Sequence, residues 1–170
     1  MSRRFALVAP LAAAACARPR VVGPRVVLVV KSLANEFYRV VEAGARAHER
    51  RTGGYTLYPT GIRDEVSVGR QVDLVDTLVA RGMDALVLVP ADAKALGSAV
   101  ARALAAGVVV VNVVEPLDAA VLARRGLRVP YVGPSNRKGA RAVGEVLARK
   151  LGPGAAVAIV EGLPTVESSR

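Results

Sequence analysis

The residues that could carry out catalysis are few in this chain of 170 residues. His48 is the only histidine, and it lies in a polar stretch with Arg46 and Glu49, which predicts an exposed position. A serine nucleophile therefore lacks a base to activate it. Cys16 is the only cysteine, so an internal disulfide is impossible and no Cys/His cluster indicates a metal. The phosphate-binding patterns G-x-G-x-x-G after the first strand and G-x-x-x-x-G-K-[ST] are also absent. We expect no enzymatic activity, no metal and no cofactor.

The charge pattern argues against nucleic-acid binding. The formal net charge is +10, but the arginines are scattered and no basic run is interleaved with aromatic residues. Most arginines fall on polar helix faces or at helix ends, where they interact favourably with solvent or with the helix dipole. A basic solvated surface is the simpler interpretation.

The first residues have the layout of an export signal. Arg3 and Arg4 precede a short apolar stretch, 5–15, and small residues follow. Residues 13–16 resemble a lipobox, in which Cys16 would be lipidated, whereas residues 15–17 offer an ordinary A-x-A cleavage site. We expect an export signal over residues 1–17 and a tether over 18–24, with any membrane association through a lipid anchor. A cytosolic protein with an apolar N-terminus is the alternative.

From residue 25 onward, strand-like and helix-like patterns alternate. The strand-like segments are continuous apolar runs, which is typical of parallel strands buried on both faces. Amphipathic helices separate them, with apolar residues at spacings of three and four. The pattern predicts an α/β fold, a doubly wound parallel sheet with helices on both faces. The predicted strands are 26–30, 55–58, 85–89, 108–113 and 156–160.

Polar residues at the helix entries suit N-capping, because their side chains accept hydrogen bonds from free backbone N–H groups. In a doubly wound sheet, ligands bind beyond the carboxyl ends of the strands. The loops expected to form a site are therefore 31–37, 59–65, 90–94, 114–118 and 133–137. The predicted caps are Asn35, Asp64, Asp92 and Ser135.

Five segments in order resemble the ribose-type periplasmic sugar-binding proteins of ABC importers. None is diagnostic alone, but their order over about residues 24–170 makes the resemblance specific. The segments are LVVKSLANEFYRVVEAGA (28–45), DALVLVPADAKAL (84–96), AGVVVVNVVEPLDAA (106–120), VPYVGPSNRKGARAVGEVLARKLG (129–152) and AVAIVEGLPTVESSR (156–170).

The resemblance implies two Rossmann-like lobes joined by crossing strands. On that map, residues 25–131 form the N-terminal lobe, and residues 132–170 form the hinge crossing and a truncated second lobe. We therefore expect this chain to be a fragment, with a folded first lobe and a remaining segment too small to fold on its own.

The resemblance also implies ligand residues after the first and third strands. Asn35 matches a family asparagine that hydrogen-bonds a sugar hydroxyl, and it also suits a helix N-cap. Phe37 and Tyr38 match adjacent aromatics that stack on the sugar ring, although one of them could pack into the core. Asp92 is a further candidate, with helix capping as its favoured alternative.

The sequence departs from the family after the fourth strand. Val114 occupies the position of an aspartate that grips sugar hydroxyls, and valine cannot accept hydrogen bonds. Either Glu115 takes over that role, or the ligand is less hydroxylated, or binding is impaired. Ser135 likewise stands where the family often has aspartate, and Arg170 falls on a family arginine that binds sugar oxygens from the second lobe.

These features lead to one principal hypothesis and two alternatives. The principal one is capture of a small polar solute, a sugar, in the periplasm or outside the cytoplasmic membrane, for delivery to the membrane subunits of an ABC importer. The alternatives are the ligand-sensing domain of a lac-repressor-type regulator, which would need a helix-turn-helix ahead of the lobe, and a binder of a non-sugar solute on the same fold.

Overall fold

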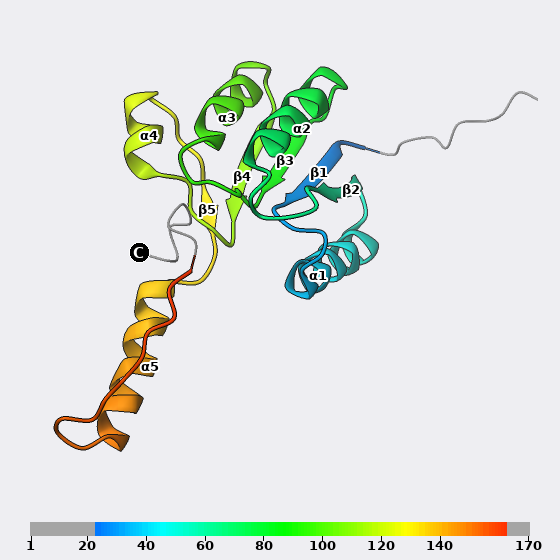
Figure 1. Cartoon of the computed structure of the whole chain (residues 1–170). Helices are drawn as coiled ribbons and strands as arrows, with labels where there is room; N and C mark the ends of the chain where they lie inside the picture. Colours follow the sequence, from blue (N-terminus) through cyan, green and yellow to red (C-terminus); the bar gives the residue numbers. More distant parts are fainter. Residues whose placement is uncertain (1–22, 163–170) are drawn as a thin grey trace, which may run out of the picture.

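The computed structural model describes residues 23–162, which form one parallel sheet flanked by helices (Figure 1). The strand order is β2-β1-β3-β4-β5, and every pairing between neighbours is parallel. The predicted α/β parallel architecture is confirmed. The strands are β1 (Arg25–Val30), β2 (Thr56–Gly61), β3 (Ala85–Leu88), β4 (Val109–Val113) and β5 (Tyr131–Val132), and the helices are α1 (Glu36–Thr52), α2 (Val68–Ala80), α3 (Leu96–Ala105), α4 (Ala119–Arg124) and α5 (Asn136–Lys150).

The two faces of the sheet are covered unequally. On one face, alternate residues of β1, β3 and β4 pack against α2 and α3, giving the larger core around Val29, Leu88 and Val100. On the other face, α1 packs against β1 and β2 in a smaller core that contains Leu28 and Tyr38. The apolar runs that predicted the strands supply four of the five buried residues of the smaller core and six of the thirteen of the larger one. They contribute to both cores because a strand between two helical layers is buried on both sides.

One predicted strand is absent and another was missed. Residues 156–160 form no strand, because no neighbouring backbone pairs with them. Tyr131–Val132 instead extends the sheet by pairing with Asn112–Val113 of β4. The apolar character of 156–160 therefore indicated a segment able to form a strand, but a strand also needs a partner to satisfy its backbone groups.

The helix caps are partly as predicted. The Asn35 side chain accepts from the backbone N–H of Phe37 and begins α1, and Ser135 accepts from that of Lys138 and begins α5. The prediction for Asp64 is wrong, since the N-cap of α2 is Ser67. Asp64 accepts from the backbone N–H of Val66 at 3.2 Å and of Ser67 at 3.0 Å. It therefore stabilises the turn before the helix, and the Ser67 hydroxyl is the main cause of its lowered pKa.

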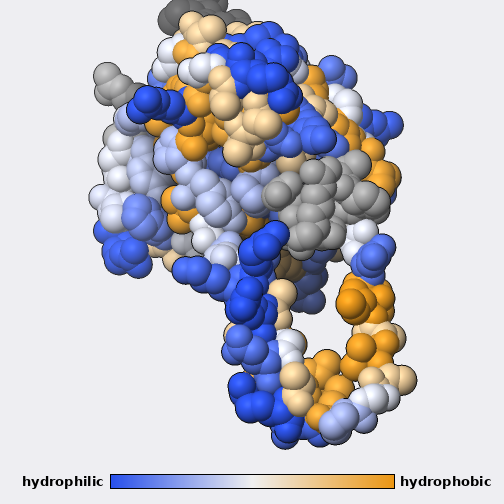
Figure 2. Space-filling model, turned by 90° about the vertical axis from the view of Figure 1, so that its left-hand side faces the viewer, coloured by the Kyte–Doolittle hydropathy of each residue, from blue (hydrophilic) through white to orange (hydrophobic). Residues whose placement is uncertain are grey.

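Helix α5 stands away from the sheet (Figure 1). None of its residues is buried, and Val143 is 69% exposed. Residues 151–162 run back beside it, and Figure 2 shows hydrophobic atoms gathered on this returning segment. Within residues 23–162, no helix is long and apolar enough to cross a membrane. The predicted export signal with Cys16 and residues 18–22 of the predicted tether lie outside the described residues, as does Arg170.

Candidate functional site

A polar hollow of about 460 Å³ lies beyond the carboxyl ends of β1, β2 and β4. It forms there because all strands run in the same direction, so the loops that follow them meet at one edge of the sheet. Of the five loops predicted to form a site, 31–37, 59–65, 114–118 and 133–137 contribute lining residues, whereas 90–94 does not. The lining residues are Lys31, Asn35, Phe37, Tyr38, Glu65, Val114, Glu115, Pro134 and Asn136.

The two aromatic residues at the start of α1 have different environments. Phe37 is 53% exposed, whereas Tyr38 is 5% exposed and belongs to the smaller core. Their rings meet edge to face, with centroids 5.2 Å apart. Burial raises the pKa of Tyr38, and the charges of Glu65 and Glu115 raise it further. Its hydroxyl therefore stays protonated and can donate a hydrogen bond.

Asn35 is the N-cap of α1 and also lines the hollow. Its Oδ1 accepts from the backbone N–H of Phe37 at 3.0 Å, and its Nδ2 donates to Oε1 of Glu65 at 3.4 Å. The cap holds the side chain at the mouth of the hollow. The bond to Glu65 connects it to the loop after β2.

Lys31 and Glu65 were not singled out by the sequence, yet they form the charged part of the hollow. Lys31 is 4% exposed, and its Nζ lies 3.2 Å from Oε2 of Glu65 and 3.6 Å from Oε1 of Glu115. An ammonium removed from water needs such partners, because an isolated buried charge is very costly. One signal could have revealed it: Lys31 directly follows the apolar run 26–30 of β1, at the end where ligands bind.

Glu115 reaches the hollow beside Val114, the residue that occupies the family's aspartate position. Both belong to the loop after β4, so the hollow retains a carboxylate, from the next residue along the chain. Asp92 does not line this hollow. Its carboxylate accepts from the backbone N–H groups of Lys94 at 2.8 Å and Ala95 at 2.7 Å, so it stabilises the turn before α3. The N-cap of α3 is Ala95, and the predicted cap at Asp92 is therefore wrong, as at Asp64.

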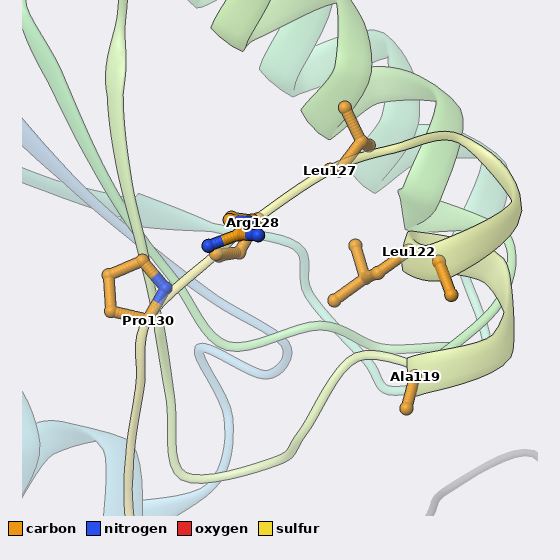
Figure 3. A pocket seen from close by; sticks show the side chains of 7 residues that line it. Ala119, Leu122, Leu127, Arg128 and Pro130 are labelled. Carbon is orange, nitrogen blue, oxygen red and sulfur yellow. The ribbon is translucent and has the colours of Figure 1, made fainter.

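A second hollow, of about 580 Å³, lies between α4 and the chain that leads into β5 (Figure 3). Leu122, Leu127 and Pro130 give it a mainly apolar lining, and Arg128 is its only charged residue. It contains none of the predicted ligand residues. Among residues 23–162 there is also no group of three or more side chains suited to hold a metal.

A parallel α/β lobe with a polar hollow at the carboxyl ends of its strands is one half of the architecture of two-lobed solute-binding proteins. The sequence pattern of the periplasmic binding protein domain matches residues 26–170, and the chain belongs to this family.

Among its relatives is the D-ribose/D-allose-binding protein of Pseudomonas aeruginosa, which is 46% identical over 148 residues, covering 86% of this chain and 46% of the relative. The ribose import binding protein RbsB of Bacillus subtilis is 31% identical over 143 residues, covering 84% of this chain and 44% of the relative. The chain thus spans about half the length of the curated relatives it matches. These relatives are binding proteins.

Solved structures of solute-binding proteins have the same fold as this chain. An ABC transporter solute-binding protein from Burkholderia multivorans superposes with a TM-score of 0.83 at 45% identity, covering 86% of this chain and 52% of the other. One from Actinobacillus succinogenes, with bound D-allose, gives a TM-score of 0.79 at 30% identity, covering 86% and 51%.

Proposed function

We propose that this chain forms one wall of the ligand site of a periplasmic binding protein that captures a small polyhydroxylated solute, a sugar, for an ABC importer. The observation that carries the proposal is the polar hollow, which places Asn35, Phe37 and Tyr38 beside the Lys31–Glu65–Glu115 cluster. The names of the relatives, which bind ribose or allose, support the same class of ligand.

The chemistry of the hollow suits a sugar. The exposed ring of Phe37 offers an apolar face to axial C–H groups. The Glu115 carboxylate is an acceptor, and the Lys31 ammonium and the Tyr38 hydroxyl are donors. Sugar hydroxyls both donate and accept, so they can bind to each member of this set.

Glu115 is proposed to replace the family's aspartate as the carboxylate of this wall. Its Oε1 is 3.6 Å from Lys31, a distance at which a sugar hydroxyl can compete for the carboxylate without leaving the ammonium unpaired, since Glu65 lies closer. Asp92 has no part in this wall, because it is engaged with the turn before α3.

The proposed setting is the periplasm or the outside of the cytoplasmic membrane, with Cys16 as the proposed lipid attachment point. Metabolic palmitate labelling in a bacterial host tests the anchor. Label that disappears in Cys16→Ser supports it, whereas soluble periplasmic material without label contradicts it.

The ligand site is tested by titrating residues 18–170 with D-allose and D-ribose, followed by two-dimensional NMR of the backbone amides. We expect shifts at Lys31, Asn35 and Phe37, with a Kd no tighter than about 1 mM because residues 18–170 are proposed to supply one wall of the site. Glu115→Ala should abolish the shifts, and Asp92→Ala serves as the matched control that leaves them unchanged. Shifts confined to the hollow of Figure 3 would refute the assignment of the site. Micromolar binding would instead show that one wall suffices.

A further inference from the structure

The buried carboxamide of Asn112 sits at the end of β4, next to the polar hollow. Asn112 is 2% exposed, and its Nδ2 donates to the carbonyl oxygens of Leu88 at 3.2 Å and Glu115 at 2.7 Å. Its Oδ1 accepts from the backbone N–H of Leu117 at 2.8 Å. One side chain therefore ties the loop after β4 to the end of β3.

Between Asn112 and Glu115 the backbone makes a tight turn. Val114 has a φ of 65°, and the N–H of Glu115 donates to the carbonyl of Val113 at 2.7 Å, which closes a three-residue turn centred on Val114. A positive φ is strongly disfavoured for a β-branched residue, and this kind of turn is strained. The conformation persists only where surrounding contacts impose it.

A second contact holds the same turn from the side of β5. The Tyr131 hydroxyl lies 2.8 Å from the Val114 carbonyl, to which it donates. The ring reaches this position by passing over Gly133, where an added Cβ would overlap the Tyr131 hydroxyl. Glycine at 133 thus makes room for the contact.

We propose that Asn112 is a positioning residue for the ligand site: its carboxamide, assisted by the Tyr131 hydroxyl, holds Val114 in the strained turn and so keeps the Glu115 carboxylate against the Lys31 ammonium. The contacts place Glu115 there independently of any ligand. The importance of that placement for binding rests on the proposed function.

The test measures how well Lys31 is protected from acetylation, in the absence of sugar. Wild-type protein and variants are treated briefly with acetic anhydride, and modification of the Lys31 peptide is followed by mass spectrometry. Asn112→Ala should raise the Lys31 rate roughly tenfold, because losing hydrogen bonds to buried partners favours opening of the loop. Tyr131→Phe should raise it less, since it removes one contact to the turn.

Two further variants separate positioning from general destabilisation. Val108→Ala truncates a buried side chain directly before β4, at the strand end opposite the loop, so it lowers stability while leaving the Lys31 rate unchanged. Adding Val114→Gly to Asn112→Ala should restore protection, because glycine adopts a positive φ without strain.

The proposal is overturned if Asn112→Ala and Tyr131→Phe both leave Lys31 as protected as in the wild type, or if Val108→Ala exposes it equally. Because no sugar is present, a failed sugar titration leaves this result standing, and the two proposals fail separately.

Discussion

The sheet-bearing lobe, residues 25–132, and the segment that follows it, 133–162, contain similar amphipathic helices in different surroundings. In α3, Val100 and Ala103 are fully buried against the sheet. In α5, Val143 and Leu147 also lie on one helical face, four residues apart, but they are 69% and 47% exposed. Both helices have an apolar stripe, yet only one of them has a surface to cover.

The difference shows what an amphipathic pattern specifies. It determines which face of a helix is apolar, and the helix forms wherever that pattern, the caps and the propensities agree. Burial, and the stability that comes with it, requires a second apolar surface. In Figure 2 the hydrophobic atoms of the returning segment near α5 remain visible at the surface, where Ile159 and Val160 are 86% and 96% exposed.

A matched pair of leucine truncations, one in the sheet and one in α5, gives the largest expected difference between the two regions. Leu86→Ala in β3 removes a fully buried side chain, and the expected loss of unfolding free energy is about 2–5 kcal/mol. Leu147→Ala in α5 should change it by less than about 0.5 kcal/mol, as an exposed substitution does. Urea denaturation followed by circular dichroism measures both. Equal losses would show that α5 contributes to the same cooperative unit as the sheet.

Removing the N-cap of a helix in each region tests the same comparison, with a smaller expected change in the free energy of unfolding. Asn35→Ala deletes the cap of α1, which packs on the sheet, and should lower the unfolding free energy by about 1 kcal/mol. Ser135→Ala deletes the cap of α5 and should reduce helix content without shifting the unfolding midpoint of the lobe. A midpoint that falls in the Ser135 variant but not in the Asn35 variant would contradict the contrast between the two regions.

The smallest predicted effect concerns alkaline pH and Tyr38. Burial, followed by the charges of Glu65 and Glu115, raises its pKa in the folded lobe above the ordinary value of 10.0. The folded state therefore holds this proton more tightly than the unfolded state does. Its contribution to the free energy of unfolding is fully present below the ordinary pKa and is lost as the pH rises above it. Between about pH 9 and pH 11, Tyr38→Phe should lose less stability than the wild type. If the free energy of unfolding depended on pH identically in the two proteins, the hydroxyl would ionise freely in the folded lobe.

Much of the lobe could be predicted from the sequence, because buried parallel strands and amphipathic helices leave strong periodic signals. Four of the five predicted strands are present, with shifted ends. The segment 156–160 and the two-residue β5 were misjudged for a common reason. Strand pairing depends on which backbone segment lies alongside, and the amino-acid composition of a segment does not determine its neighbour.

The site was predicted less completely. Asn35, Phe37, Tyr38 and Glu115 do gather in one hollow, since each follows the carboxyl end of a strand. Lys31 and Glu65 were missed because ion pairing depends on side chains 34 residues apart that only the sheet brings together. The strained turn at Val114 was also invisible, because a positive φ at valine contradicts local preference.

The interior position of β1 has a consequence for how the lobe is made. β1 pairs with β2 on one side and with β3 on the other, so three neighbouring strands of the sheet can pair once residue 88 has emerged during synthesis. Each pairing must wait for its intervening helix, since parallel strands cannot be joined by a tight hairpin. The lobe can therefore assemble from β1, the first strand to be synthesised, while β4 and β5 are still being added. The loop that carries Glu115 follows β4, so it is among the last parts of the lobe to fold.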